Sequence, residues 1–287
     1  MDSPQFLDDH TIPYSVSGKN VSKGWIGISC PFCGDQSNHL GINLEHLNYS
    51  CFVCGEKGYI TKLIHTLLDV PYAKAKSLLA QYSEDQIIYE QQQRLRASSV
   101  KFDFPMMTWK HKEYLMRRRF DPDYLEQYYH LKSGGPVGKY MHRIIIPYIY
   151  GDQIVTFNAR TIHDQSPKYL TASKDESVFT AKETLYGIDF CKKDRICLVE
   201  GPADVWRMGD GFAALSGINI SPRQLLQVKD YSRVYIMLDS TASKEAMKVA
   251  EDISIMVKET YVVHLEQGDP GELTDEAAIE IRKELGI

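Results

Sequence analysis

The sequence predicts a multidomain α+β protein, in which an N-terminal four-cysteine ribbon with helices precedes a mixed α/β domain. Three features of the 287-residue chain support this prediction. Two Cys-x-x-Cys pairs flank a predicted hairpin, a polar stretch follows, and two apolar strands in the last third each end at an acidic residue. We place the parts at residues 1–83, a linker at 84–103, then 104–190 and 191–287.

The ribbon contains the strongest motif of the chain, formed by Cys30, Cys33, Cys51 and Cys54. Each pair stands at a strand end, and residues 39–50 between the pairs have the pattern of a hairpin. This arrangement brings four thiolates around one structural Zn²⁺. Four of six cysteines in two tight pairs fit metal binding in a reducing cytosol better than a disulfide framework. A redox dithiol and unrelated cysteines are the alternatives.

The remaining elements follow from periodicity and from turn residues. Residues 1–24 give few signals, and we expect a partly ordered lead-in. Apolar residues at helical spacing predict helices after the ribbon, and helix-start signals predict two more beyond the linker. These helices are expected at 58–68, 71–82, 113–119 and 121–129. A hairpin is expected over 143–157, with its turn at Gly151-Asp152.

The last third has the pattern of a parallel α/β sheet whose strands end in carboxylates. The two apolar strands end at Glu200 and Asp239, and Asp204 and Asp269 are further candidates. Because the carboxyl ends of neighbouring parallel strands meet at one edge of a sheet, ligands bind there. Clustered carboxylates suit hard cations such as Mg²⁺. The alternative is that these acids only cap the helices that follow them.

Composition and charge exclude several classes of protein. With 43% hydrophobic and 25% charged residues, the chain has the composition of a globular protein. No apolar run reaches the length of a membrane span, and the N-terminus lacks a secretory signal, so we expect a cytoplasmic protein. The net charge of −5 argues against indiscriminate binding of nucleic acid. Residues 181–287 hold 13 Lys and Arg against 19 Asp and Glu. Contacts with a polyanion are therefore expected from local basic patches in residues 1–180.

The motifs and their order resemble those of the DnaG-type primases of bacteria and phages over nearly the whole chain. The ribbon followed by Gly58-Tyr59-Ile60 resembles the family's zinc-binding domain. Pro167-Lys168-Tyr169-Leu170 resembles its basic segment, and Glu200-Gly201 with Asp204 resembles the first motif of its Toprim fold. Four cysteines, rather than three with a histidine, are closer to the phage version.

The resemblance implies a zinc ribbon followed by a mixed α/β RNA polymerase domain that ends in a Toprim α/β fold. It implies synthesis of short RNA primers on single-stranded DNA from ribonucleoside triphosphates, with Mg²⁺ or Mn²⁺ as catalytic metal. Because the sequence ends at Ile287 without a helicase region, a replicative helicase is expected as a separate chain. The expected location is the cytoplasm of a bacterium or of a phage-infected host.

The resemblance also implies roles for particular residues. It assigns the catalytic metal to Glu200, Asp239 and Asp269, with Asp204 as a nearby helper. Nucleotide or template binding is implied for a set of residues in the basic segment: Arg143, Asn158, Arg160, Lys168, Tyr169 and Lys182. Template reading is expected on the ribbon, at Trp25, His39 and Tyr49. Alternatively, the cations are ordinary surface charges and the aromatic residues form the core of the ribbon.

Two positions depart from the family's motifs. Thr241 stands where the second motif has its second acid, and Gly271 stands where the third motif has its second aspartate. The site would then be one or two acids short. Two other functions therefore stay open: a Toprim nuclease or topoisomerase-like enzyme, and a non-enzymatic DNA-binding protein with a weakened Toprim site.

Overall fold

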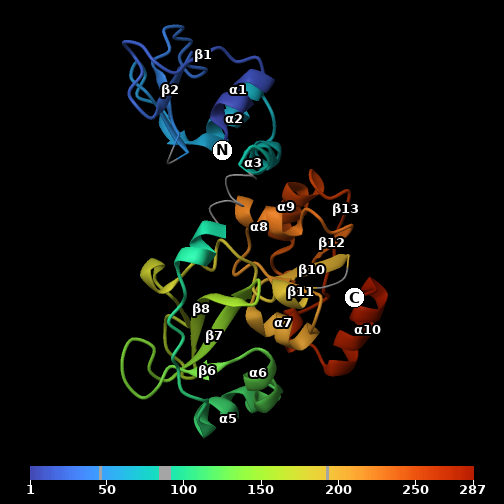
Figure 1. Ribbon diagram of the computed structural model, residues 1–287. Coiled ribbons are helices and arrows are strands. Elements are labelled where there is room, and N and C mark those ends of the chain that lie inside the picture. Colours follow the sequence, from blue (N-terminus) through green and yellow to red (C-terminus); the bar gives the residue numbers. More distant parts are fainter. Residues whose placement is uncertain (45–46, 84–91, 192–193) are drawn as a thin grey trace. The chain divides into compact units, whose positions relative to one another are not determined.

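The computed structural model describes residues 1–44, 47–83, 92–191 and 194–287 and divides the chain into two units, Met1–Gln91 and Gln92–Ile287 (Figure 1). Residues 84–91 of the predicted linker lie outside the described residues. Residues 92–97 are helical, and Leu95 and Val100 pack against the core of the second unit. The second half of the predicted linker therefore belongs to the second unit. Its polar composition concealed the few apolar residues that anchor it.

The first unit is built on an antiparallel sheet of five short strands in sequential order. The strands are β1 (Tyr14–Ser15), β2 (Trp25–Ile28), β3 (Leu40–Asn43), β4 (Asn48–Cys51) and β5 (Lys57–Tyr59). The predicted hairpin is the β3–β4 pair, in which Leu40 lies opposite Cys51. Because β2 also pairs with β3, the two cysteine pairs begin at the same end of the sheet.

Among its described residues, this unit also contains the helices α1 (Ser3–Asp9), α2 (Ile60–Leu68) and α3 (Tyr72–Gln81). Helices α2 and α3 confirm the two helices that the apolar periodicity predicted in this unit. Helix α1 corrects the expectation of a partly ordered lead-in, because Phe6 and Leu7 are 2% and 0% exposed. Asp2 caps this helix by accepting a hydrogen bond from the backbone N–H of Gln5 at 3.0 Å.

The second unit begins with a four-stranded antiparallel sheet in the order β6-β7-β8-β9. These strands are β6 (Lys132–Ser133), β7 (Arg143–Tyr150), β8 (Gln153–Thr161) and β9 (Tyr169–Thr171). The preceding helices are α5 (Trp109–Arg117) and α6 (Pro122–Tyr128), and a short 3-10 turn, η1 (Lys174–Glu176), follows β9. The predicted hairpin is the long β7–β8 pair, which Figure 1 shows at the centre of this unit.

A four-stranded parallel sheet in the order β11-β10-β12-β13 forms the rest of this unit. Its strands are β10 (Arg195–Val199), β11 (Phe212–Ala214), β12 (Arg233–Ile236) and β13 (Glu259–Val262). The accompanying helices and 3-10 turns are η2 (Ile188–Phe190), α7 (Pro202–Met208), α8 (Pro222–Val228), α9 (Ser243–Ser254), η3 (Pro270–Glu272) and α10 (Asp275–Leu285).

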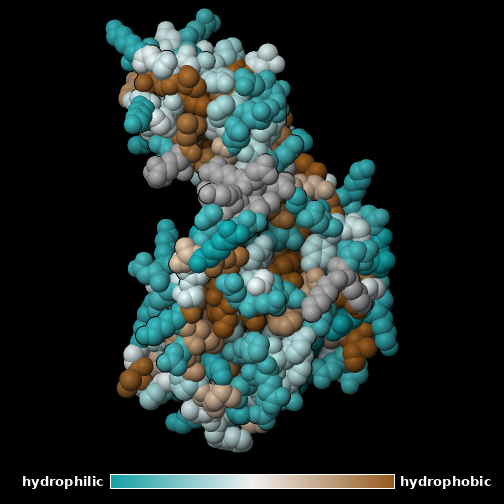
Figure 2. Space-filling view, viewed as in Figure 1, coloured by the Kyte–Doolittle hydropathy of each residue, from teal (hydrophilic) through white to brown (hydrophobic). Residues whose placement is uncertain are grey.

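Both faces of the parallel sheet are covered. Cys197 and Val199 point into one hydrophobic cluster, and Ile196 and Leu198 point into another, all four at 0% exposure. The continuous apolar run of β10 is therefore that of a strand buried on both sides. The predicted fold class, a four-cysteine ribbon followed by a mixed α/β domain, is confirmed. No helix within the described ranges is long and apolar enough to cross a membrane. On the face shown in Figure 2, the apolar patches of the second unit are scattered among hydrophilic residues.

Candidate functional site

The four cysteines of the ribbon converge on a single point. All four Sγ atoms lie within 4.8 Å of one another, and those of Cys30 and Cys54 are 3.9 Å apart. Gly34 and Gly55 follow the two pairs with φ of 72° and 74°, a left-handed conformation that glycine adopts without strain. The structure therefore brings the four predicted cysteines together as the donor set of a structural zinc site.

Hydrogen bonds prepare one of these thiols to lose its proton. Burial opposes the ionisation of Cys51, but the backbone N–H groups of Cys54 and Val53 outweigh it and lower the pKa of the thiol to about 7. A zinc ion binds the thiolate rather than the thiol, so these N–H groups favour the metal-bound form.

The three predicted metal-binding acids meet at one edge of the parallel sheet. Glu200 follows β10, Asp239 lies beyond β12, and Asp269 precedes η3. Burial, and then the charges of Asp239 and Asp269, raise the pKa of Glu200. Burial and then Asp269 likewise raise the pKa of Asp239. Mutual repulsion of this kind is expected where carboxylates face one another.

The acids are less tightly gathered than the cysteines. Within the described ranges, only the cysteines form a group of three or more possible ligands within 4.8 Å of one another. Asp269 nevertheless has a feature that suits a cation. Its Oδ1 is buried and has no hydrogen-bond partner among the described residues. A buried carboxylate oxygen of this kind is costly unless something positive reaches it.

Asp204 links two segments of the acidic edge through hydrogen bonds. It is 6% exposed, its Oδ2 accepts from the backbone N–H of Gly201 at 2.8 Å, and its Oδ1 accepts from that of Gly271 at 3.1 Å. Burial is the main cause that raises the pKa of its carboxyl, to about 7. Because both oxygens bind backbone, Asp204 joins the loop after β10 to η3. It thereby connects the segments that carry Glu200 and Asp269.

The same contact explains why Gly271 replaces an acid of the family's motif. A Cβ atom at this position would lie 2.9 Å from Oδ1 of Asp204 and 3.1 Å from Oδ1 of Asp269. At these separations, a side chain at position 271 would require the carboxylate of Asp204 to shift. Thr241, at the other departure, is exposed and brings no charge to the site.

Lys182 is a predicted basic residue that the structure brings to Glu200. Its Nζ donates to the backbone oxygen of Ser216 at 2.7 Å. Its charge acts on Glu200, where it opposes the rise in pKa. Lys168 is exposed on the loop before β9.

Arg143 corrects a prediction made from the motifs. Its side chain is buried, with 4% of the residue exposed, and it donates to three backbone oxygens. The acceptors belong to Ala159, Pro167 and Lys168, at 3.2, 3.1 and 3.3 Å. These hydrogen bonds direct both terminal nitrogens of Arg143 at the backbone. It holds the loop that presents Lys168.

Arg160 lies between two tyrosines. Its Nε donates to the hydroxyl of Tyr114 at 2.6 Å, and one terminal nitrogen donates to that of Tyr169 at 2.5 Å. The β8–β9 register places Arg160 opposite Tyr169, and the guanidinium carbon lies 4.9 Å from the centre of that ring. Arg160 and Tyr169, both predicted from the basic segment, thus contact each other. Tyr114, in α5, completes the set.

Asn158 is the second correction in the basic segment. It is 7% exposed, and its Nδ2 donates to the hydroxyl of Tyr148 at 2.7 Å. That hydroxyl lies 2.6 Å from Oγ of Ser216, whose backbone oxygen accepts from Lys182. Asn158 therefore supports the loop beside Lys182 through its amide nitrogen, and its buried Oδ1 has no hydrogen-bond partner among the described residues.

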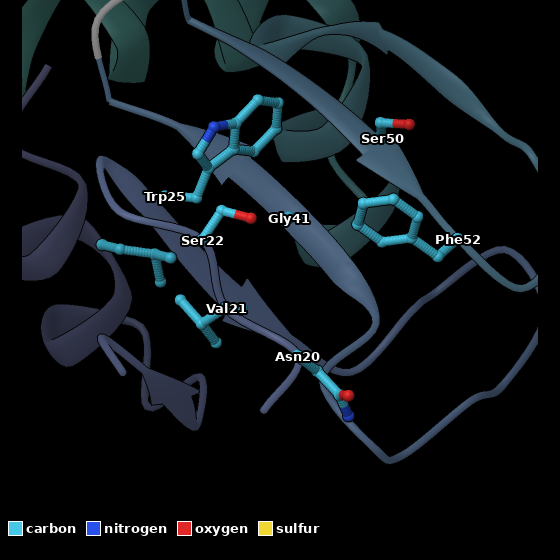
Figure 3. A pocket seen from close by; sticks show the side chains of 9 residues that line it. Asn20, Val21, Ser22, Trp25, Gly41, Ser50 and Phe52 are labelled. Carbon is cyan, nitrogen blue, oxygen red and sulfur yellow. The ribbon is translucent and has the colours of Figure 1, made fainter. Parts of the chain in front are cut away.

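The predicted reading face of the ribbon is only partly as expected. Tyr49 is 2% exposed, and its ring stacks on Phe32 at 5.4 Å, so it belongs to the core and cannot stack on a base. His39 is half-buried and lies 3.1 Å from the carboxylate of Asp35. Trp25 lines a cavity of about 220 Å³ together with Phe52, which is 77% exposed (Figure 3).

Two protein-family models match the chain. Residues 10–95 match the family described as "CHC2 zinc finger", and residues 105–192 match "DNA primase catalytic core, N-terminal domain". Both models describe domains of the DnaG-type primases. The DNA primase of Clostridium acetobutylicum is 22% identical over 80% of this chain and 48% of its own length. That of Streptomyces coelicolor is 31% identical over 48% of this chain and 25% of its own length. The chain thus spans about half, or less, of these relatives.

Solved primase structures share the fold. The zinc-binding and RNA polymerase domains of the Aquifex aeolicus primase match with a TM-score of 0.52 and 22% identity, over 100% of this chain and 83% of that one. A DnaG primase catalytic domain bound to single-stranded DNA matches with a TM-score of 0.51 and 18% identity, over 70% of this chain and 78% of that one. The two-part architecture is therefore that of the primase family.

Proposed function

We propose that this chain synthesises short RNA primers on single-stranded DNA. In this reaction the 3′ hydroxyl of the growing strand attacks the α-phosphate of a ribonucleoside triphosphate, and pyrophosphate leaves. The observation that carries the proposal is the acidic edge of the parallel sheet. There Glu200, Asp239 and Asp269 influence one another's charge and Lys182 stands beside them. We take this sheet to be the Toprim fold that the motifs suggest.

The acidic edge would hold Mg²⁺ or Mn²⁺, and the buried free oxygen of Asp269 supports this. A divalent cation there neutralises charge on phosphate oxygens in the transition state. Glu200, Asp239 and Asp269 are the ligands that we propose. Asp204 acts through them, because its hydrogen bonds set the spacing of the loops on which two of them lie.

The residues beside the acids would bind the polyanionic reactants. Phosphoryl transfer depends on positioning and charge neutralisation, and Lys182 is placed to contribute to both. We assign Lys168, and Arg160 with Tyr169, to the nucleotide or to the template backbone. Arg143 holds the loop that carries Lys168, and Asn158 supports the loop beside Lys182 through Tyr148.

We assign template reading to the ribbon. Trp25 and the exposed Phe52 border the cavity of Figure 3, and aromatic rings of this kind can stack on unpaired bases. His39 lies outside the described lining of that cavity and stays a weaker candidate. Ribonucleoside triphosphates as substrates, a separate replicative helicase as partner and a cytoplasmic location complete the proposal.

A primer-synthesis assay tests this function. The chain is incubated with ribonucleotides, Mg²⁺ or Mn²⁺, and single-stranded templates of mixed sequence, and the products are resolved on a denaturing gel. Oligoribonucleotides that depend on the template are expected. Cleavage of the DNA without such products would favour a Toprim nuclease. DNA binding with neither product would favour a non-enzymatic protein, as the departures at Thr241 and Gly271 allow.

A further inference from the structure

A cavity of about 540 Å³ lies at the start of α5 in the second unit. None of the residues assigned above to metal, nucleotide or template lines it. We propose that it receives an unpaired base of the nucleic-acid strand, with Trp109 as the stacking surface. The proposal deepens the proposed function, because it adds a second contact for the single strand outside the reaction centre.

The walls of the cavity present aromatic and apolar surface to solvent. Trp109, the first residue of α5, is 70% exposed, and Met106 is 57% exposed. Pro105 and Pro136 are among the lining residues and stiffen its backbone. An indole that remains exposed here offers a flat ring to a planar ligand.

The cavity is also built from fixed parts. His111 lines it and is only 3% exposed. Its Nδ1 lies 2.8 Å from Oγ1 of Thr108, and its Nε2 lies 3.5 Å from Oγ of Ser133. The opposite wall folds back tightly, because a Cβ on Gly134 would lie 1.8 Å from the backbone oxygen of Tyr140. The shape of the cavity therefore exists before a ligand arrives.

The formal charges at the cavity come from lysines. Lys110 and His142 line it, and no acidic residue is among its described lining. Lys132 lies beside it, with Nζ 2.8 Å from the sulfur of Met106. The nearby acid Glu126 is already used, since it accepts from the backbone N–H of Met107 at 2.6 Å and pairs with Lys112 at 3.2 Å. An exposed indole beside unneutralised cations is typical of surfaces that bind single strands, whereas an apolar peptide would need no such cations.

The cavity also connects to the proposed template contacts within the same unit. His142 lines the cavity, and its ring lies 5.6 Å from that of His163. The next residue, Arg143, holds the loop of Lys168 through two backbone oxygens. The cavity and the loop of Lys168 are therefore joined by the neighbouring residues His142 and Arg143.

Photo-cross-linking tests this site in the full chain. A single-stranded oligonucleotide that carries 5-iodouracil is bound and irradiated, and the cross-linked peptides are identified by mass spectrometry. A cross-link to Trp109 is expected. Stacking on one base contributes about 1–3 kcal/mol, so Trp109→Ala should weaken binding at least about fivefold, and Trp109→Phe should retain most of the affinity.

Two further variants separate stacking from charge. Lys110→Ala should lower the slope of log affinity against log salt concentration by about one, whereas Trp109→Ala should leave that slope unchanged. Tyr261→Ala is the matched control, because Tyr261 is 49% exposed on β13, which Figure 1 shows far from α5. Wild-type affinity in Trp109→Ala, with no cross-link to this cavity, would overturn the proposal.

The outcome is separable from that of the primer-synthesis assay. Primer synthesis by a wild-type chain that shows no cross-link at Trp109 would contradict the cavity alone. A cross-link at Trp109 in a chain that makes no primers would support the cavity as a nucleic-acid site and contradict the proposed enzymatic function.

Discussion

Replacement of Arg143 by alanine separates a structural role from a phosphate-binding one. The change removes three hydrogen bonds from a charged donor to backbone oxygens in a buried place. Each such bond contributes about 1.5–3 kcal/mol, which sets an upper range of about 5–9 kcal/mol. Two of the three bonds are only partly buried, so water can replace the guanidinium there. We therefore expect a loss of about 3 kcal/mol in the free energy of unfolding.

Thermal unfolding followed by circular dichroism measures this loss. For a domain of about 150–250 residues, 3 kcal/mol lowers Tm by about 6–12 °C. Arg117→Ala is the matched control, since that side chain is 70% exposed and its pairing with Glu113 is long, at 3.8 Å; it should shift Tm by about 1 °C or less. An Arg143→Ala protein with unchanged Tm but much weaker binding of single-stranded DNA would refute the structural assignment.

Three further predictions concern the metal site, the acidic edge and acid stability. Cys33→Ser, or a strong chelator, should unfold the first unit while calorimetry still shows the transition of the second; simultaneous loss of both would contradict independent units. Gly271→Asp should lower stability by about 1–3 kcal/mol in urea unfolding and give no gain in activity, because its Cβ meets Asp204. Although burial opposes it, hydrogen bonds from Lys139 and others lower the pKa of Glu176 to about 2. Its stabilising effect is thus complete above pH 4.5 and lost as the pH falls towards 2, so Glu176→Gln should flatten the pH dependence of Tm in that window.

The sequence predicted those parts of the fold that local patterns determine. Cysteine spacing, apolar periodicity and strand-end acids depend on residues close in the chain, and they located the ribbon, α2, α3 and the edge at Glu200. Helix α1 depends instead on a distant contact, since the ring of Phe6 lies 5.3 Å from that of Tyr82. A seven-residue segment shows too little periodicity to reveal such a contact.

The sequence predicted which residue types gather at the candidate site better than it predicted the directions of their side chains. Motif similarity pointed to Arg143, Asn158 and Tyr49, but it does not say which way a side chain points. The structure turns all three inward, where they hold loops or fill the core. The hydrogen bond from the backbone N–H of Gly271 to Asp204 links positions far apart in the sequence, and no local sequence pattern predicts it.

We propose that the acidic edge of the parallel sheet performs template-directed primer synthesis. Glu200→Gln tests it most directly, because the amide keeps the size of the side chain and removes the charge that would bind the metal. The wild-type chain should make oligoribonucleotides on single-stranded DNA. The variant should lose at least about 100-fold in product while its affinity for the DNA is unchanged. Equal product from the two proteins would contradict the account.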